Sequence, residues 1–245
     1  MAARSGPIDI DVPATWPIPI LHRVNQLATA LSGTTEHAAD LDWRAQDRDE
    51  FRTLLGGRPI RAYHATRLLD HEAEMVVEHG LLLLTSELLS MRIDRAFQHG
   101  YISKKQHDEL CAGHVFSTGE HKNRGGQVCL FVGEETLRHE YGLDNLLCTW
   151  GGEGIYQSSG THHLEEKLRL LGRPTMVVVE LDIGSAQEIA TFSPDLWKMF
   201  VGHHLHLRGV SAAINYRASI PPQCIACLWQ PGHPEYDRIE RLPRD

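Results

Sequence analysis

The residues best suited to chemistry lie in two short stretches, of which the first is RAYHATR. It places an imidazole, a hydroxyl and a guanidinium close together, at His64, Thr66 and Arg67. An imidazole and a hydroxyl can hydrogen-bond the hydroxyl and amide groups of a ligand, and a guanidinium can pair with a phosphate. We therefore predict a nucleotide pocket on this segment, with Tyr63 as a further ligand contact.

The second stretch is TWGGEGIY, in which Gly151 and Gly152 allow the backbone to approach a ligand or to adopt positive φ. Trp150 offers a flat face for stacking, and Glu153 and Tyr156 are three residues apart, so they share one side of a helical turn. A carboxylate beside an aromatic ring suits a sugar–nicotinamide ligand, because the carboxylate stabilises positive charge on the sugar while the ring stacks on the base. The alternative is a tight turn whose Trp150 and Tyr156 pack in the core.

Sixteen histidines suggest another chemistry, because two groups of them have spacings that metal ligands use. The groups are His162-His163 with Glu165-Glu166, and His203-His204 with His206. On a strand His204 and His206 would share one face, and Asp182 could add the acid of a metal-dependent hydrolase or nuclease. The chain has no HExxH motif, and both groups fall in polar segments. We therefore predict surface histidines and no metal, with the metal-dependent enzyme as the alternative.

The five cysteines are odd in number and lack the spacing of a disulfide framework, which predicts reduced thiols and a cytoplasmic location. Cys224 and Cys227 form a CxxC, but they lie in the apolar run CIACLW, which indicates a buried strand.

Charge and hydropathy limit the partners of the chain. The formal net charge is -8, with 24 basic against 32 acidic residues, which disfavours general attraction to nucleic acid or to an anionic membrane. No apolar run is long enough for a transmembrane helix, and the N-terminus lacks the basic and apolar regions of a secretory signal.

Periodicity and turn residues predict the elements that would position these groups. The expected helices cover 20–55, 68–80 and 85–111, the second ending at Gly80 and the third broken at Gly100 and resumed at a Ser103 cap. The expected strands are RPIRAYHAT, HVFST, QVCLFVG, TMVVVELDI and two pieces around Pro221-Pro222. The segment 192–206 suits either a lid over a site or a short helix.

This order of elements does not alternate strand and helix, and both the dinucleotide fingerprint and the phosphate-binding loop are absent. We therefore predict an α+β fold with a split, largely antiparallel sheet. Residues 1–57 would form a Pro-rich, helical N-terminal extension, and residues 58–245 the ligand-binding domain.

Four segments taken in order resemble the ADP-ribosyltransferase fold: YHATR, the helix that ends in EHGL, the GHVFST segment and the GGEGIY turn. The similarity is greatest to the His-Tyr-Glu branch, which includes the poly(ADP-ribose) polymerases and diphtheria-toxin-like bacterial toxins. The resemblance implies that His64 and Thr66, on the first core strand, hold the NAD ribose. It also implies that the next helix ends at Gly80-Leu81.

The resemblance extends to the later motifs of that branch. It implies that Tyr156 stacks on nicotinamide together with Trp150. It further implies a catalytic glutamate at the start of a late strand, before a segment that IPPQCI at 220–225 matches closely. Asn215 stands at this position, so either Asn215 replaces the glutamate or Glu153 supplies the carboxylate from another element.

The function implied by the resemblance is ADP-ribosyl transfer from NAD, as substrate, to a protein or nucleic-acid acceptor. Arg67, or Arg61 on the opposite strand face, would then pair with the pyrophosphate. A role as a bacterial toxin or defence effector follows by family analogy. A domain that binds NAD or ADP-ribose without reacting it is the alternative that Asn215 favours.

Overall fold

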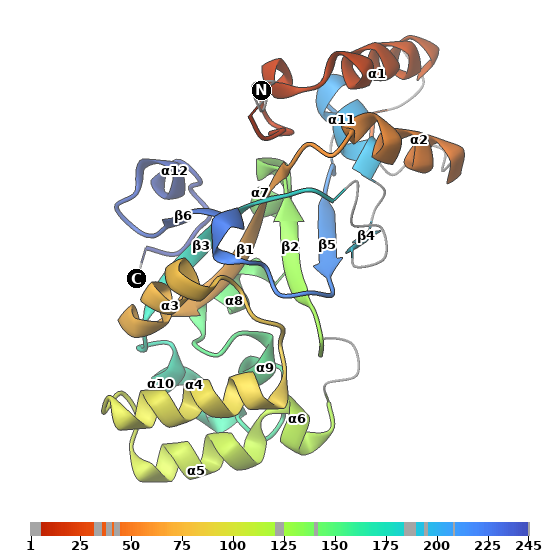
Figure 1. Cartoon of the computed structure of the whole chain (residues 1–245). Helices are drawn as coiled ribbons and strands as arrows, with labels where there is room; N and C mark the ends of the chain where they lie inside the picture. The colour runs from red at the N-terminus through yellow and green to blue at the C-terminus, as the bar shows by residue number, and fades with distance from the viewer. Residues whose placement is uncertain are drawn as a thin grey trace. The chain divides into compact units, whose positions relative to one another are not determined.

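Six strands form one open sheet in the order β4-β5-β2-β1-β3-β6 (Figure 1). They are β1 (Ile60–Leu68), β2 (Val128–Val132), β3 (Arg173–Leu181), β4 (Ala190–Ser193), β5 (Ala212–Tyr216) and β6 (Ile225–Trp229). The pairs β1–β2 and β4–β5 are antiparallel, with Tyr63 opposite Phe131 and Thr191 opposite Asn215. The computed structural model describes residues 6–31, 36–37, 41, 45–120, 125–139, 142–183, 190–193, 196–207 and 209–244.

Helices occupy most of the chain between the strands, so the fold is a mixture of helices and an antiparallel sheet. The α-helices are α1 (Ile18–Leu31), α2 (Ala45–Leu55), α3 (Asp70–His79), α4 (Ser86–Gln98), α5 (Lys104–Gly113), α6 (Val115–Thr118), α7 (Glu134–His139), α8 (Leu143–Cys148), α9 (Glu153–Tyr156), α10 (Glu165–Leu168), α11 (Leu196–His204) and α12 (Pro234–Asp237). Short 3-10 helices are η1 (Pro13–Thr15), η3 (His162–Leu164) and η4 (Pro222–Cys224). None of the described helices is both long and apolar enough to cross a membrane.

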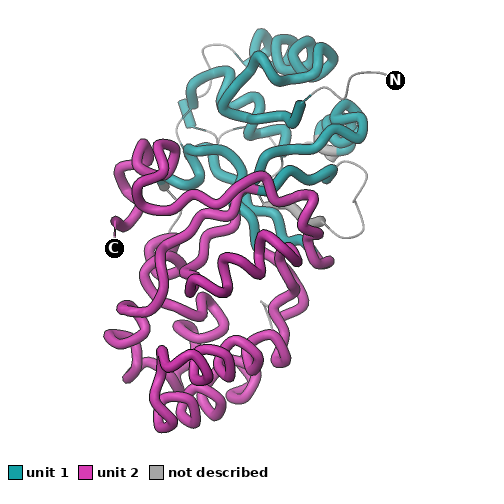
Figure 2. Tube along the Cα trace, turned by 60° about the vertical axis from the view of Figure 1, so that its left-hand side comes forward, with its two compact units in different colours: residues 1–63, 129–140, 179–216 teal, residues 64–128, 141–178, 217–245 magenta. Residues whose placement is uncertain are grey.

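The chain divides into two compact units (Figure 2). Unit 1 contains residues 1–63, 129–140 and 179–216, and unit 2 contains residues 64–128, 141–178 and 217–245. The expected N-terminal extension therefore belongs to the same unit as β4, α11 and β5. The expected split of the sheet is not present in the strand pairing, because β1 is hydrogen-bonded between β2 and β3 in one continuous sheet.

Within unit 1, aromatic contacts connect the N-terminal helices to α11. The ring of Phe200 lies 5.0 Å from that of Trp16, which precedes α1, and 5.7 Å from that of Phe51 in α2. An ion pair of 2.9 Å joins Arg23 of α1 to the buried Asp47 of α2. Because α11 is almost entirely buried, the segment 192–206 contains a packed helix and not an exposed lid.

Within unit 2, local capping defines the starts of the helices α4 and α5. The Thr85 hydroxyl accepts from the Leu88 N–H at the start of α4, and Ser103 and Gln106 form a capping box at the start of α5. Gly100, with φ of 76°, makes the turn between the two helices. The predicted break at Gly100 and the predicted Ser103 cap are therefore confirmed.

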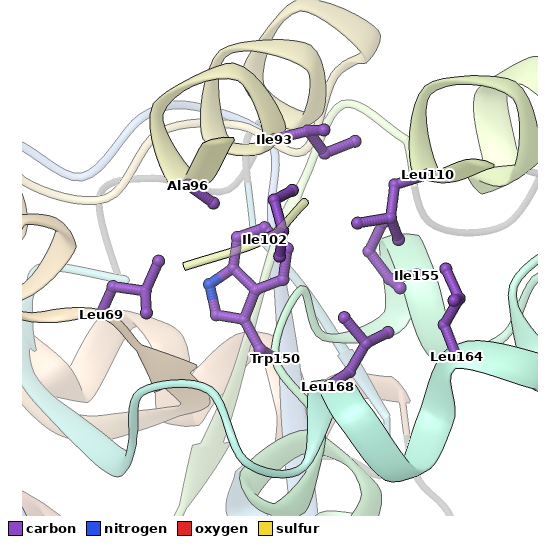
Figure 3. Close-up of a cluster of buried hydrophobic side chains, with 9 residues drawn as sticks. All are labelled: Leu69, Ile93, Ala96, Ile102, Leu110, Trp150, Ile155, Leu164 and Leu168. Carbon is purple, nitrogen blue, oxygen red and sulfur yellow. The ribbon is translucent and has the colours of Figure 1, made fainter. Parts of the chain in front are cut away.

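A buried hydrophobic cluster forms part of the core of unit 2, around the inner face of α4 (Figure 3). Its members are Leu69, Ile93, Ala96, Ile102, Leu110, Trp150, Ile155, Leu164 and Leu168. They come from several short elements that are distant in sequence, so the cluster holds the helical part of the unit together.

Two strand predictions are wrong in part. HVFST forms the helix α6 and not a strand, because His114 caps its first turn and accepts from the Ser117 N–H. CIACLW contains the strand β6, but β6 is the last strand of the sheet, so Cys227 is exposed and only Trp229 is buried. The strands expected in RPIRAYHAT, QVCLFVG and TMVVVELDI are confirmed as β1, β2 and β3.

Candidate functional site

A pocket of about 100 Å³, open to solvent, lies in unit 2 between β1, α3 and α4. Its lining residues are His64, Thr66 and Leu68 from β1, His71, Glu72, Met75, Val76, His79, Gly80, Leu81 and Leu82 from α3 and the segment after it, and Leu88, Met91, Arg92 and Arg95 from α4. The wall is mainly apolar, and a few polar and charged groups converge on the hollow, which is the usual composition of a small-molecule site.

The alternation of side chains along β1 brings two of the predicted residues into the pocket. His64, Thr66 and Leu68 are two apart, so they share one face of the strand, and all three line the hollow. Thr66 is buried and His64 is half-buried. The imidazole and the hydroxyl predicted to act together are thus neighbours on one wall.

The same alternation keeps the predicted arginines away from the pocket. Arg67 is 4% exposed; its Nε donates to the Leu171 carbonyl at 2.6 Å and its Nη1 to the Leu147 carbonyl at 3.2 Å. Arg61 is ion-paired to Asp9 at 3.0 Å. Neither guanidinium is among the described residues that line the hollow, because both stand at odd positions of β1, so the predicted pairing with pyrophosphate has no support in this hollow.

Tyr63 also stands at an odd position and is 2% exposed. Burial, followed by the charges of Asp9 and Asp11, raises the pKa of its phenol far above the usual value of 10.0. A neutral, buried phenol beside carboxylates is a structural group of unit 1. The side chain of Tyr63 is in the core, so the prediction that it contacts a ligand is not supported.

One wall of the pocket is held by the carboxylate of Glu72, which the sequence did not single out. Glu72 is 5% exposed and accepts from Arg92 Nε at 2.7 Å, from Trp150 Nε1 at 2.9 Å and from the Leu69 N–H at 2.9 Å. Burial alone would raise the pKa of Glu72, but the charge of Arg92 and these hydrogen bonds lower it below the usual value of 4.5. Glu72 is therefore an ionised carboxylate whose hydrogen bonds connect α3 to Arg92 of α4 and to Trp150.

Trp150 belongs to the hydrophobic core and not to a ligand-stacking surface. It has no exposed area, and Figure 3 shows its ring among the side chains of Leu69, Ala96 and Ile102. Arg92 lies over the ring, 5.3 Å from its centroid. The predicted stacking of Trp150 on nicotinamide is wrong, because the indole is enclosed on both faces and its N–H is used to orient Glu72.

The end of α3 and the segment at Ile220 meet beside the pocket. Leu81 exchanges two backbone hydrogen bonds with Ile220, of 2.9 and 2.8 Å. At Gly80, with φ of 82°, an added Cβ would lie 1.9 Å from the Ile220 carbonyl oxygen, so only glycine fits. Two motifs that were linked only by the family resemblance are thus in direct contact.

The GGEGIY turn starts the short helix α9. Gly151 has φ of 94°, and an added Cβ would lie 2.2 Å from the Ile155 side chain, so this glycine serves the turn and its packing. Gly152 precedes the first residue of the helix with φ of 58°. Neither glycine contributes to the described pocket lining, so their predicted close approach to a ligand has no support in this hollow.

Glu153 and Tyr156 lie on one side of α9, as their spacing predicts. Both are within hydrogen-bonding distance of Gln157, at 3.3 Å for Glu153 Oε1 and 3.5 Å for the Tyr156 hydroxyl. Gly154, between them, faces Leu89 of α4. Both residues are half-buried and in the same unit as His64, but neither is among the described residues lining the pocket.

Asn215 lies in β5 of unit 1 and is half-buried. Its Oδ1 is 3.5 Å from the sulfur of Cys129, which can donate a weak hydrogen bond. An amide in this place is an uncharged group in the sheet, unlike the glutamate that the family resemblance leads one to expect.

The functional side chains missed by the sequence lie on the two helices. Leu88, Met91, Arg92 and Arg95 follow the spacing of one helical face, which indicates the side of α4 that lines the pocket. His71 of α3 stacks on His99, with ring centroids 4.5 Å apart. Burial lowers the pKa of His71, even though the charge of Glu72 opposes that shift, so its imidazole is neutral near pH 7.

The two histidine groups do not have the strand geometry on which the alternative of a metal-dependent enzyme depends. His203 and His204 end α11, and His206 follows in a turn with φ of 55°, so they are not on a strand. His162 and His163 are exposed in η3. Among the described residues, the group close enough to share an ion is a different one, formed by Asp94, His107 and Cys111.

Comparison with protein-family models, with curated proteins and with solved structures finds no match to this chain.

Proposed function

We propose that the chain is an ADP-ribosyltransferase-type domain that binds NAD, with the nicotinamide–ribose end in the pocket between β1, α3 and α4. The observation that carries this proposal is the meeting of three features at one hollow. His64 and Thr66 share a wall, and the α3 terminus at Gly80-Leu81 forms another part of the lining. These are the residues that the family resemblance assigns to the NAD ribose and to the following helix.

The size of the hollow supports a ligand fragment and not a whole dinucleotide. A volume of about 100 Å³ corresponds to roughly three water molecules, at about 30 Å³ for each. A nicotinamide ring with its amide is of about this size. The remainder of the dinucleotide would extend through the open side of the pocket.

The chemistry of the lining supports the same fragment. Thr66 can donate to or accept from the amide, and a neutral His64 can do both for ribose hydroxyls. Met75 and Met91 offer polarisable sulfur atoms that suit the face or edge of a heterocycle. In place of Arg67, Arg95 is the better candidate for a phosphate, because no carboxylate lies within ion-pairing distance of it among the described residues.

In the proposed reaction the bond between the anomeric carbon and the nicotinamide nitrogen breaks, and nicotinamide leaves with the bonding electron pair. A nucleophile of a protein or nucleic-acid acceptor then attacks the anomeric carbon and loses its proton. By the family resemblance, Glu153 would stabilise the positive charge that develops on the sugar and Tyr156 would stack on the departing ring. Neither is among the described residues that line the hollow, so both roles rest on the resemblance alone. A role as a toxin or defence effector follows only by analogy with the family.

The second candidate is a domain that binds NAD or ADP-ribose without reaction, and Asn215 favours it. If the carboxylate of the reaction belongs at that position of β5, an amide there cannot supply the negative charge that an oxocarbenium-like centre requires. Binding would then persist without release of nicotinamide.

Release of nicotinamide from NAD, measured with and without a mixture of candidate acceptors, separates the two candidates. For the enzyme we expect release by the wild type and a loss of about a hundredfold or more in Glu153→Gln, as for removal of a charge-stabilising group. The matched control is Glu166→Gln, an exposed carboxylate on α10, which should leave the rate unchanged. Equal rates in both variants would remove Glu153 from the mechanism, and binding without release would favour the second candidate.

A further inference from the structure

Outside the pocket, side chains of three types with metal-binding atoms meet where α4 and α5 lie side by side (Figure 1). Asp94 comes from α4, and His107 and Cys111 come from α5. The last two are four residues apart, so they point to the same side of the helix. The sequence analysis did not single out this group, because its members come from two helices.

The ligand atoms of Asp94, His107 and Cys111 are close enough together to bind one metal ion. His107 Nε2 is 2.7 Å from Asp94 Oδ1 and 3.7 Å from the sulfur of Cys111. The three candidate ligand atoms all lie within 4.8 Å of one another. Asp94 is exposed, while His107 and Cys111 are half-buried, so the group opens to solvent on the side of Asp94.

A second carboxylate orients the imidazole. Asp108 Oδ1 lies 3.1 Å from His107 Nδ1, and the same oxygen accepts from Lys104 at 2.6 Å. A carboxylate on one ring nitrogen favours the tautomer in which the other nitrogen carries a lone pair toward a metal. Metal-binding histidines commonly have such a partner.

We propose that Asp94, His107 and Cys111 form a site for a divalent cation of the zinc class, which joins α4 to α5. The mixed set of oxygen, nitrogen and sulfur ligands suits Zn²⁺ or Co²⁺, and is unsuited to Mg²⁺ or Ca²⁺, which prefer oxygen alone. Three protein ligands leave the fourth position of a tetrahedral ion for water on the exposed side.

Two of the three ligand separations can be compared with those around a bound ion. At zinc–ligand distances of about 2.0–2.3 Å, a tetrahedral site separates nitrogen from sulfur by about 3.6 Å and nitrogen from oxygen by about 3.3 Å. The sulfur is already at that separation from His107. The Asp94 carboxylate must move outward by about half an ångström, which an exposed side chain can do by a small rotation.

Titration of the reduced, metal-free protein with Co²⁺, and then with Zn²⁺ in competition, tests this site. We expect one equivalent of Co²⁺ to bind with a near-ultraviolet band from thiolate-to-cobalt charge transfer, and Zn²⁺ to displace it. Cys111→Ser should abolish the band, and His107→Gln should weaken binding tenfold or more. Asp108→Asn should weaken it about tenfold to a hundredfold, as loss of an orienting partner does.

Matched controls separate this site from binding elsewhere on a histidine-rich chain. Cys227→Ser removes an exposed cysteine of β6, and His162→Gln removes an exposed histidine, so both should bind one equivalent like the wild type. The proposal is overturned if the wild type gives no thiolate band at saturating Co²⁺. It is equally overturned if Cys111→Ser or His107→Gln retains the affinity of the wild type.

Discussion

At the scale of single residues, Glu72 links the core of unit 2 to the wall of the pocket. It receives hydrogen bonds from Arg92, Trp150 and the Leu69 N–H, and it is nearly inaccessible to solvent. A buried charge of this kind is stabilising only while all of its partners are present.

Replacing Glu72 by Gln should therefore destabilise the protein. The change leaves the guanidinium of Arg92 without its countercharge, and we expect the free energy of unfolding to fall by about 3 kcal/mol. Glu74→Gln, an exposed position on the same helix, should change it by less than about 0.5 kcal/mol. Urea unfolding at pH 7 measures both, and an equal effect in the two variants would contradict the role given to Glu72.

The difference between wild type and Glu72→Gln should also depend on pH. The pKa of Glu72 is lower in the folded protein than its usual value of 4.5. The stability that its carboxylate contributes is therefore fully present above pH 4.5 and is lost as the pH falls through the folded pKa. Unfolding at a series of pH values from 7 to 3 should show the two curves converging at the acidic end.

The sequence allows the chemistry of a single residue to be predicted, but it does not show which other residues will surround that residue in the fold. His64 and Thr66 could be assigned to one wall because alternation along a strand is a local property. Arg67 and Trp150 could not be placed, because the carbonyls that bind Arg67 and the side chains that enclose Trp150 come from distant parts of the chain.

At the scale of elements, the helix ends are the best-determined features of unit 2. The capping box of Ser103 and Gln106 satisfies backbone groups that α5 would otherwise leave unpaired. Ser103→Ala should lower the free energy of unfolding by about 1 kcal/mol. Ser90→Ala, inside α4, lacks a capping role and should have an effect of less than about 0.5 kcal/mol; equal losses in thermal or urea unfolding would argue against the cap.

The turn into α9 depends on glycine for two reasons, left-handed backbone and close packing. Gly151→Ala should destabilise by about 3 kcal/mol, because the methyl group meets Ile155 in addition to the backbone strain. Gly119 has φ of 79° and open space around it, so Gly119→Ala should lower the free energy of unfolding by about 1 kcal/mol, from backbone strain alone. If urea unfolding gives the two variants the same stability, the packing of Gly151 against Ile155 is not what the turn requires.

Elements with strong local signals were predictable, and those defined by their neighbours were not. Gly80, Gly100 and Ser103 mark helix ends through backbone conformation or capping, and each is where the sequence predicts it. HVFST is too short for its apolar pattern to separate strand from helix. The burial of CIACLW depends on the order of strands in the sheet, which is a property of the whole fold.

At the scale of the whole molecule, one buried and two half-buried histidines make the folded state sensitive to mild acid. Burial lowers the pKa of His71, His114 and His203 below the usual value of 6.5. The unfolded chain therefore binds more protons than the folded protein just below pH 6.5, so stability is lost as the pH falls from 6.5 through the folded pKa values.

The contribution of one of these histidines can be isolated. His203 has a buried Nδ1 without a hydrogen-bond partner among the described residues, whereas its neighbour His204 is exposed. The loss of stability between pH 7 and pH 5 should be smaller in His203→Gln than in the wild type, and unchanged in His204→Gln. Urea midpoints at the two pH values decide this, and an unchanged pH dependence in His203→Gln would contradict it.

The most direct test of the central claim is the equilibrium binding of NAD, measured by calorimetry on the wild type, His64→Ala and His162→Ala. The histidine removed in the first variant lines the pocket, and the one removed in the second is exposed on η3. We predict that NAD binds the wild type and His162→Ala equally, and binds His64→Ala at least tenfold more weakly while its circular dichroism is unchanged. Absence of NAD binding by the wild type, or equal affinity in all three proteins, would contradict the claim that this pocket binds NAD.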